Sequence, residues 1–131
     1  MSIKDNVIYY AFEVSSKMHG TTSEDVRNNR DRKGVNIKTK RLLIYYMHNY
    51  LGIKHYKMKK YFNNIHHATS IHHNKKFKFE LNTYHQVRYD FDIFLKKMTN
   101  YSIYGHNFKE KINEIQQLLN ELKTVINDKR I

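Results

Sequence analysis

Apolar residues recur at three- and four-residue steps through most of this chain, and this spacing constrains the fold more than any other feature. An α-helix turns once every 3.6 residues, so such steps gather the apolar side chains on one helical face. The chain of 131 residues contains no proline, which argues against a linker-rich or disordered chain. No segment repeats within the sequence. The spacing therefore predicts an all-α fold.

The predicted helices begin and end at residues suited to those positions. Gly20 and Gly52 are expected to end the first and third helices, and Thr22 or Ser23 to cap the second. The polar run around Gly34 predicts a loop. The expected segments are a helix over residues 4–18, a short helix after the cap, a loop over 28–36, a long helix over 37–52, a helix over 83–98, a linker over 99–107 and a last helix from residue 109.

A further pair of short helices is expected in the middle of the chain. The segments 55–62 and 67–79 flank Asn63 and Asn64, and asparagine tolerates the left-handed backbone of a tight turn. Two short helices joined by such a turn form a helix-turn-helix. The sequence therefore predicts this DNA-binding motif.

Net charge is the most informative part of the composition. The chain has 24 Lys and Arg against 12 Asp and Glu, a net charge of +12. A surplus of this size on one small domain points to a polyanionic partner, most often nucleic acid. A solvated basic surface with no such partner is the plainer alternative.

The same composition excludes several other classes. The chain has no cysteine, so disulfides, thiolate metal sites and cysteine nucleophiles are excluded together. Its first 16 residues lack the apolar run of a signal peptide, and no segment approaches the roughly 20 apolar residues that span a membrane. We therefore expect a cytoplasmic protein with no membrane partner.

Three segments share a pattern with a known family: Asp25 and Val26 before a basic loop; Ile37, Arg41 and Tyr46 in the long helix; and Phe62, His67 and Thr69 around the turn. Together these segments, spanning residues 3–77, resemble the C-terminal, origin-binding domain of the bacterial replication initiator DnaA. The resemblance implies an all-α helix-turn-helix domain that reads duplex DNA. It also implies that a basic side chain near Lys33 enters the minor groove.

The sequence departs from that family at four positions of the signature. Ile65 and His66 stand where the family has Arg and Asp, and Ala68 and Ser70 replace a Thr and an aliphatic residue. Because His66 removes an acceptor for cytosine, the preferred DNA sequence should differ. No GxxxxGK phosphate loop is present, so no initiator ATPase module is expected.

The residue types also suit DNA binding on their own chemistry. The first turn of the second motif helix normally faces base edges in the major groove. Thr69 offers a methyl group and a hydroxyl, and His67 offers a hydrogen-bond donor. The predicted DNA-binding residues are Arg30, Arg32 and Lys33 in the loop; Lys38, Lys40 and Arg41 in the long helix; Lys54 and Lys57 in the first motif helix; Asn63 and Asn64 in the turn; and His66, His67, Ala68, Thr69 and Ser70 in the reader helix.

Metal binding and catalysis have weaker support. Four histidines lie within residues 62–73, but the spacings of five to seven between the pairs do not match the four-residue spacing of zinc-binding helices. His66 and His73 could share a face, yet no carboxylate lies nearby in sequence. No Ser/His/Asp arrangement is visible, and a nuclease site from Glu80, Asp90 and Asp92 would need strands that the pattern does not predict. We expect no metal, no cofactor and no enzymatic activity.

The last helix carries a heptad-like apolar seam of Ile112, Ile115, Leu119, Leu122 and Ile126. The seam covers only about two heptads, so it predicts packing on the same domain, with self-association or a protein partner as the alternative. The expected organisation is a DnaA-like helix-turn-helix domain over residues 1–80 and a helical extension over 81–131.

The predicted function is sequence-preferring binding of double-stranded DNA, in replication or transcription of a phage or other mobile element. The corresponding location is the nucleoid of a bacterial cell or of a phage-infected host. The alternative is a protein-interaction or inhibitor module that keeps the fold and has lost base reading through the changes at Ile65, His66 and Ala68.

Overall fold

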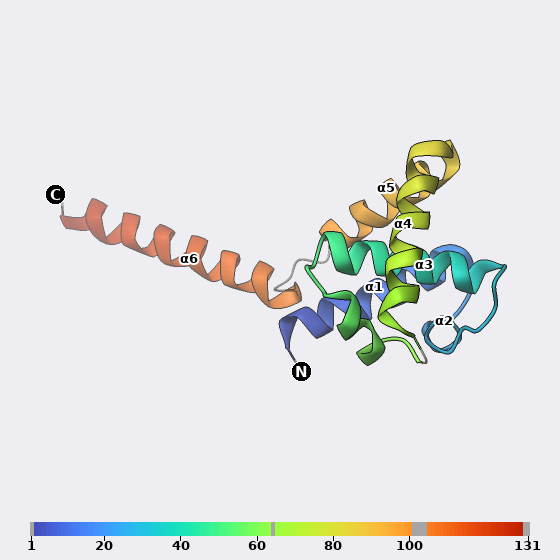
Figure 1. Cartoon of the computed structure of the whole chain (residues 1–131). Coiled ribbons are helices and arrows are strands. Elements are labelled where there is room, and N and C mark those ends of the chain that lie inside the picture. The colour runs from blue at the N-terminus through green and yellow to red at the C-terminus, as the bar shows by residue number, and fades with distance from the viewer. Residues whose placement is uncertain (1, 64, 101–104, 130–131) are drawn as a thin grey trace. The chain divides into compact units, whose positions relative to one another are not determined.

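The computed structural model describes residues 2–63, 65–100 and 105–129, with side chains described for 2–63, 65–100 and 113–126, and every regular element in these ranges is helical (Figure 1). This agrees with the all-α fold that the apolar spacing predicts. The elements are α1 (Ile3–His19), α2 (Ser23–Arg27), α3 (Val35–Asn49), the 3₁₀ helix η1 (His55–Lys60), α4 (His67–Thr83), α5 (His85–Asn100) and α6 (Gly105–Lys129).

The first two helices begin and end within one residue of the predicted positions. The Ser2 hydroxyl accepts a hydrogen bond of 3.1 Å from the Asp5 amide at the start of α1. Gly20 ends that helix with a positive φ of 70°, a conformation that glycine adopts without steric cost. Thr22 caps α2 by accepting from the Asp25 amide at 3.2 Å. The predicted cap at Thr22 is therefore confirmed.

Helix α3 lies at the centre of the first compact unit, which spans residues 1–99. It contacts α1, α2 and α4. Leu43, Ile44 and Met47 of α3 are fully buried, as are Ile8 and Phe12 of α1. The expected loop before α3 is two residues shorter than predicted, because the helix already begins at Val35 and Gly34, with a φ of 96°, forms its N-terminal boundary.

The predicted pair of short helices is only partly correct. The first is a 3₁₀ helix of six residues, and the second, α4, continues for 17 residues to Thr83. No glycine or proline interrupts residues 67–83, and Phe77 is buried near the middle of α4. A buried aromatic side chain holds this part of the chain on the core, so the helix does not end at residue 79.

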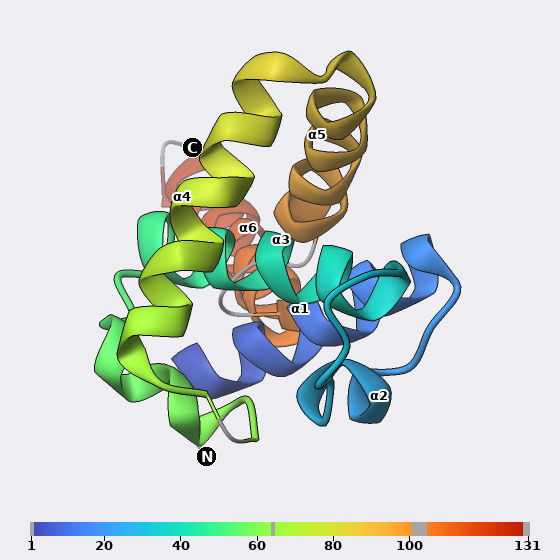
Figure 2. The ribbon, with the colours of Figure 1, turned by 45° about the vertical axis from the view of Figure 1, so that its right-hand side comes forward.

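Helix α5 belongs to the same compact unit as α1–α4. The ring centres of Tyr45, Phe77 and Phe91, from α3, α4 and α5, lie 5.2–5.6 Å apart, and Figure 2 shows α4 and α5 side by side. Phe94 is fully buried against Tyr46. The unit therefore ends at Thr99, whereas the sequence suggested a boundary at residue 80.

The second unit, residues 100–131, contains α6. This helix begins at Gly105, four residues before the predicted start, and α5 reaches Asn100, so much of the predicted linker is helical. Large apolar side chains of α6 are about half exposed, namely Ile115, Leu118, Leu119, Leu122, Val125 and Ile126. The side chain of Ile112 lies outside the described residues. Within the described part of the chain, no helix is long and apolar enough to cross a membrane.

Candidate nucleic-acid interface

A groove of about 600 Å³ on the first unit brings together two predicted binding segments that are far apart in sequence. One wall is the basic loop before α3, including Arg30 and Arg32. The other wall is the first part of α4, including Thr69 and His72, and Ile37 of α3 also lines it. Packing of α4 against α3 places these segments on the same face. The groove is our candidate nucleic-acid interface.

The basic loop presents its charges to solvent. Arg30, Arg32 and Lys33 are all exposed, and none of them forms an ion pair with a described residue. Asn29 at the base of the loop is buried, and its carbonyl oxygen accepts a hydrogen bond of 3.3 Å from Lys40. The loop is thus anchored at Asn29 while its cationic side chains stay available.

Lys40 lines the groove but is almost fully buried, contrary to its predicted role as an exposed phosphate contact. Its side chain is buried at 6 % exposure, with the ammonium group 6.0 Å from the centre of the Phe62 ring. Burial lowers the pKa of Lys40. The predicted position was wrong because Lys40 follows the buried face of α3, between Ile37 and Leu43. Its role is to hold the loop at Asn29.

The other two basic residues predicted on α3 are exposed to different extents. Lys38 is exposed and pairs with Asp90 of α5 at 3.6 Å. Arg41 is half-buried, and its guanidinium lies 3.5 Å from the Glu80 carboxylate. The Nε atom of Arg41 also donates to Nδ1 of His73 at 3.4 Å. Arg41 lines the groove, yet much of its charge is directed at α4.

His73 is neutral under ordinary conditions. Burial, together with the nearby Arg41 and Lys40 charges, lowers the pKa of His73 to about 4. A neutral ring leaves Nδ1 free to accept the Arg41 hydrogen bond. The contact between Arg41 and His73 therefore joins α3 to α4 within the lining of the groove.

The first turn of α4 is open to solvent. His66 forms the N-terminal boundary with an extended backbone and no side-chain cap. His67, Ala68 and Thr69 are exposed. Helix N-terminal N–H groups without a side-chain cap can donate to a phosphate oxygen. These four predicted residues are therefore accessible to a ligand.

Ser70 is not accessible, so its predicted contact with DNA is corrected. Its side chain is fully buried and lies 2.7 Å from Nδ1 of His55 in η1. The His55 ring stacks on His48, with ring centres 3.9 Å apart. Burial, with the neighbouring His48 and His67 charges, lowers the pKa of His55. Ser70 thus connects the two helices of the motif, because the fourth residue of α4 points inward.

The predicted residues of η1 and the turn lie outside the groove lining. Lys54 and Lys57 are exposed, and neither lines the groove. Asn63 is exposed, donates from its backbone N–H to the Arg27 carbonyl at 2.9 Å, and hydrogen-bonds through its side chain to Asn28. Asn64 lies outside the described residues.

Sequence reasoning missed the continuation of the candidate interface along α4. His72 lines the groove one turn after Thr69, and Lys75 and Lys76 are exposed one further turn along the helix. The expected helix over residues 67–79 already contains these residues, so the helical period alone could have placed His72 and Lys76 on the same side of the helix as Thr69.

The histidine-rich stretch at the start of α4 does not assemble a metal site in the part of the chain that the structure describes. No three or more of its His, Asp and Glu residues are grouped so as to hold a metal ion. His66 is exposed at the helix boundary, whereas His73 is buried against Arg41. The two therefore have different environments.

No protein family model, no curated protein and no solved structure matches the sequence or the fold.

Proposed function

We propose that this protein binds double-stranded DNA through the groove between the basic loop and the start of α4. The observation that carries the proposal is the meeting of exposed Arg30 and Arg32 with Thr69 and His72 around one groove. The net charge of +12 gives the whole chain a favourable long-range interaction with a polyanion.

In this proposal α4 is the reader helix of a DnaA-like helix-turn-helix. The exposed His67, Ala68 and Thr69 meet base edges in the major groove, where a threonine methyl suits thymine and a histidine N–H suits a purine acceptor. Lys75 and Lys76, further along α4, contact phosphates. Sequence preference therefore resides mainly in the first turn of α4.

The basic loop supplies a second contact. Arg30, Arg32 and Lys33 reach the adjacent minor groove, where arginine favours the narrow, electronegative form of A·T-rich DNA. Lys40 holds the loop at Asn29 and Arg41 pairs with Glu80 of α4, so both support the groove that they line. The groove is then a preformed surface with charged walls.

The proposal assigns no chemical step to the protein. Its place is in replication or transcription of a phage or other mobile element, at the nucleoid of the bacterial host. Sequence preference combined with a single reader helix suits such a role.

Fluorescence anisotropy with labelled duplexes tests the proposal. We expect Arg30→Ala/Arg32→Ala to weaken binding to random duplex DNA by at least tenfold at 50 mM salt. Lys96→Ala/Lys97→Ala is the matched control, because it removes the same charge from exposed positions on α5. Equal losses in the two variants would show that net charge, and not the groove, carries binding.

The alternative function is a protein-interaction or inhibitor module. The half-exposed apolar side chains of α6 favour it, since such a face suits a partner helix. On this view the wild-type protein does not bind random duplex DNA even at low salt. The same anisotropy measurement therefore separates the two functions.

A further inference from the structure

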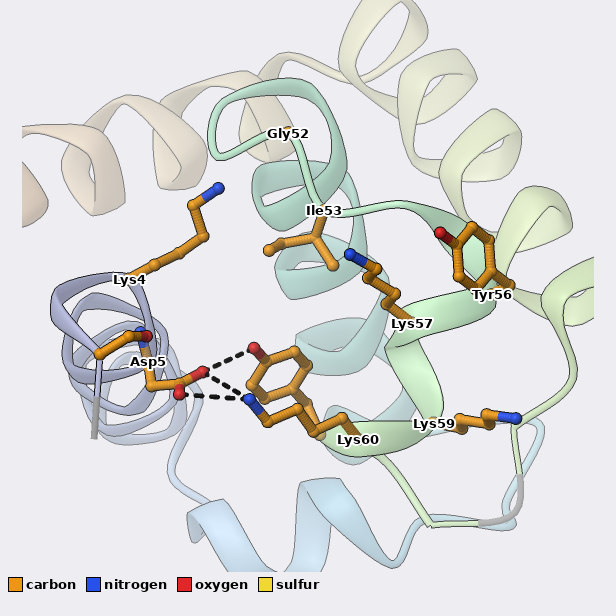
Figure 3. Close-up of a pocket in the computed structure, with 10 residues that line it drawn as sticks. Lys4, Asp5, Gly52, Ile53, Tyr56, Lys57, Lys59 and Lys60 are labelled. Atoms are coloured by element: carbon orange, nitrogen blue, oxygen red, sulfur yellow. Dashed lines mark hydrogen bonds and ion pairs between the residues drawn. The ribbon is translucent and has the colours of Figure 1, made fainter.

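A second pocket lies on the first unit and shares no lining residue with the groove. It has a volume of about 640 Å³ and is bordered by the start of α1 and by η1. Figure 3 shows Lys4 of α1 and Lys57 of η1 on either side of Ile53, which contributes an apolar surface between them. Two cationic side chains therefore approach one space from different elements.

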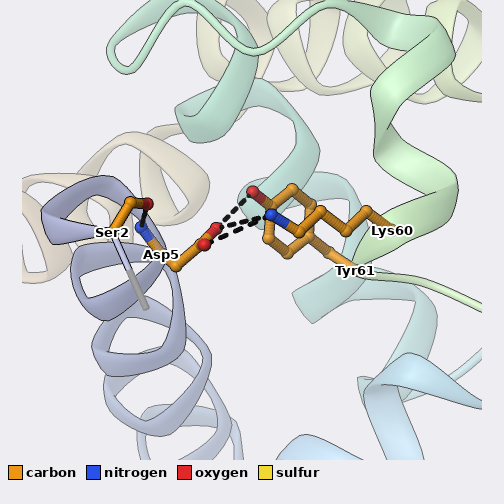
Figure 4. A network of polar contacts seen from close by, with 4 residues as sticks. All are labelled: Ser2, Asp5, Lys60 and Tyr61. Carbon is orange, nitrogen blue, oxygen red and sulfur yellow. Dashed lines mark hydrogen bonds and ion pairs between the residues drawn. The ribbon is translucent and has the colours of Figure 1, made fainter.

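The one carboxylate in this pocket is already engaged. Both oxygens of Asp5 lie 3.2 Å from the Lys60 ammonium, and one accepts a hydrogen bond of 2.7 Å from the Tyr61 hydroxyl (Figure 4). These contacts lower the pKa of Asp5 to about 2, with the Tyr61 hydrogen bond as the largest cause. Asp5 is therefore ionised and its charge is offset by Lys60.

The remaining lysines of the pocket have no acidic partner among the described residues. Lys4, Lys57 and Lys59 are exposed and form no ion pair there. Lys57 lies 5.9 Å from the centre of the exposed Tyr56 ring. Figure 3 shows Lys59 directed away from Lys4. The uncompensated charge of the pocket thus comes chiefly from Lys4 and Lys57.

Size and charge together identify the class of ligand. The volume falls within the range of about 300–1,000 Å³ that small-molecule sites occupy, and it exceeds what a single phosphate ion needs. Ammonium groups bind phosphate oxygens as point charges. We propose that this pocket binds consecutive phosphate groups of one ligand, held between Lys4 and Lys57. The phosphates come from a free polyphosphate or from a nucleic-acid backbone.

Calorimetric titration of the full-length protein with inorganic tripolyphosphate tests this inference, and anisotropy with a random duplex tests the second source. The variant is Lys4→Ala/Lys57→Ala, whose exposed positions leave the core intact. Lys96→Ala/Lys97→Ala again removes the same charge elsewhere. Circular dichroism checks that both variants keep the helical content of the wild type.

Two results support the inference and identify the source. Binding of one tripolyphosphate that weakens about tenfold in the Lys4/Lys57 variant, and less than twofold in the control, assigns a free polyphosphate. If tripolyphosphate does not bind but duplex affinity falls about tenfold more in that variant than in the control, the phosphates belong to nucleic acid.

Two other results overturn the inference. Equal losses of affinity in the two variants would show that net charge alone explains the effect. Unchanged affinity of the Lys4/Lys57 variant for both probes would show that the pocket does not bind phosphate. Failure here leaves DNA binding through the groove intact, because the Arg30→Ala/Arg32→Ala variant reports on that function separately.

Discussion

The two compact units differ in charge and in how well their apolar residues are covered. Residues 1–99 contain 19 Lys and Arg against 8 Asp and Glu, whereas residues 100–131 contain 5 against 4. Phe12, Phe62 and Phe94 are fully buried in the first unit, while Leu118 and Leu119 of the second are more than half exposed. Nearly all surplus charge thus lies on the unit with a closed core. Substitutions in the first unit should therefore alter polyanion binding, and substitutions in the second unit should alter helix association.

We expect the largest effect from salt concentration, which should change the affinity of the first unit for duplex DNA. If about 5–8 phosphates are contacted, affinity for duplex DNA should fall about 10²- to 10⁴-fold between 50 and 200 mM salt, because bound lysines and arginines release counterions. Anisotropy titrations at several salt concentrations measure the slope. Flat affinity across this range, or no binding at the lowest salt, would contradict the proposed function.

Truncation of a core aromatic residue tests which unit α5 belongs to. Phe94→Ala should destabilise the first unit by about 3–5 kcal/mol, since it leaves a cavity beside Tyr46. Denaturant unfolding measures the change. Tyr89→Ala is the control on the same helix, because Tyr89 is exposed and its loss should cost little. If both substitutions had similarly small effects on stability, α5 would not be part of the core of the first unit.

Base reading should depend on one exposed side chain of the first unit. Thr69→Ala should cost about 1–3 kcal/mol of binding free energy on a selected DNA site and little on random duplex DNA. Lys33→Ala should weaken binding to both, as a charge contact does. Thr83→Ala, at the far end of α4, serves as the control. Equal losses of Thr69→Ala on both DNAs would reject a base-reading role.

The apolar seam of α6 gives a test on the second unit. We expect it to pack on the same domain, so the protein should sediment near 16 kDa at micromolar concentration. Leu119→Asp should then destabilise the fold by about 0.5–3 kcal/mol, and Gln117→Asp on the polar face should not. A mass near twice that value, or a fully stable Leu119→Asp monomer that still binds DNA, would contradict packing in cis.

Acidic pH should lower the stability of the first unit by a smaller amount, through the contact between Arg41 of α3 and His73 of α4. The pKa of His73 is about 4 in the folded protein and near 6.5 when unfolded. The unfolded chain therefore binds more protons between these values, and the contribution of His73 to stability, complete above about pH 6.5, is lost as pH falls towards 4. Thermal unfolding from pH 7 to 4 measures this loss.

His73→Gln should flatten that dependence, because glutamine can still accept the Arg41 hydrogen bond without titrating in this range. A residual slope is expected from His19 and His55, whose pKa values are also lowered chiefly by burial. If the pH dependence of stability were unchanged in the variant, protonation of His73 would not be coupled to unfolding.

The sequence by itself determined the helices of this protein and, within one residue, the ends of α1 and α2. The expected stop at Gly52 was wrong, because α3 ends at Asn49. The apolar spacing fixes which segments are helical, and Ser2, Thr22 and Gly20 act locally, through hydrogen bonds and backbone conformation within a few residues of themselves. Such local interactions do not depend on the rest of the fold. Arg30 and Arg32 are exposed because they lie in the polar loop that the sequence predicts.

Only the tertiary structure decided which polar residues serve the core. Lys40 and Ser70 resemble surface residues in the sequence, but packing of α3 and α4 buries both, where each meets a polar partner from another segment. The length of α4 and the inclusion of α5 in the first unit likewise depend on the aromatic contacts of Phe77 and Phe91. These contacts join residues distant in sequence, and helical periodicity, which reports only which face of a helix is apolar, does not specify which faces meet.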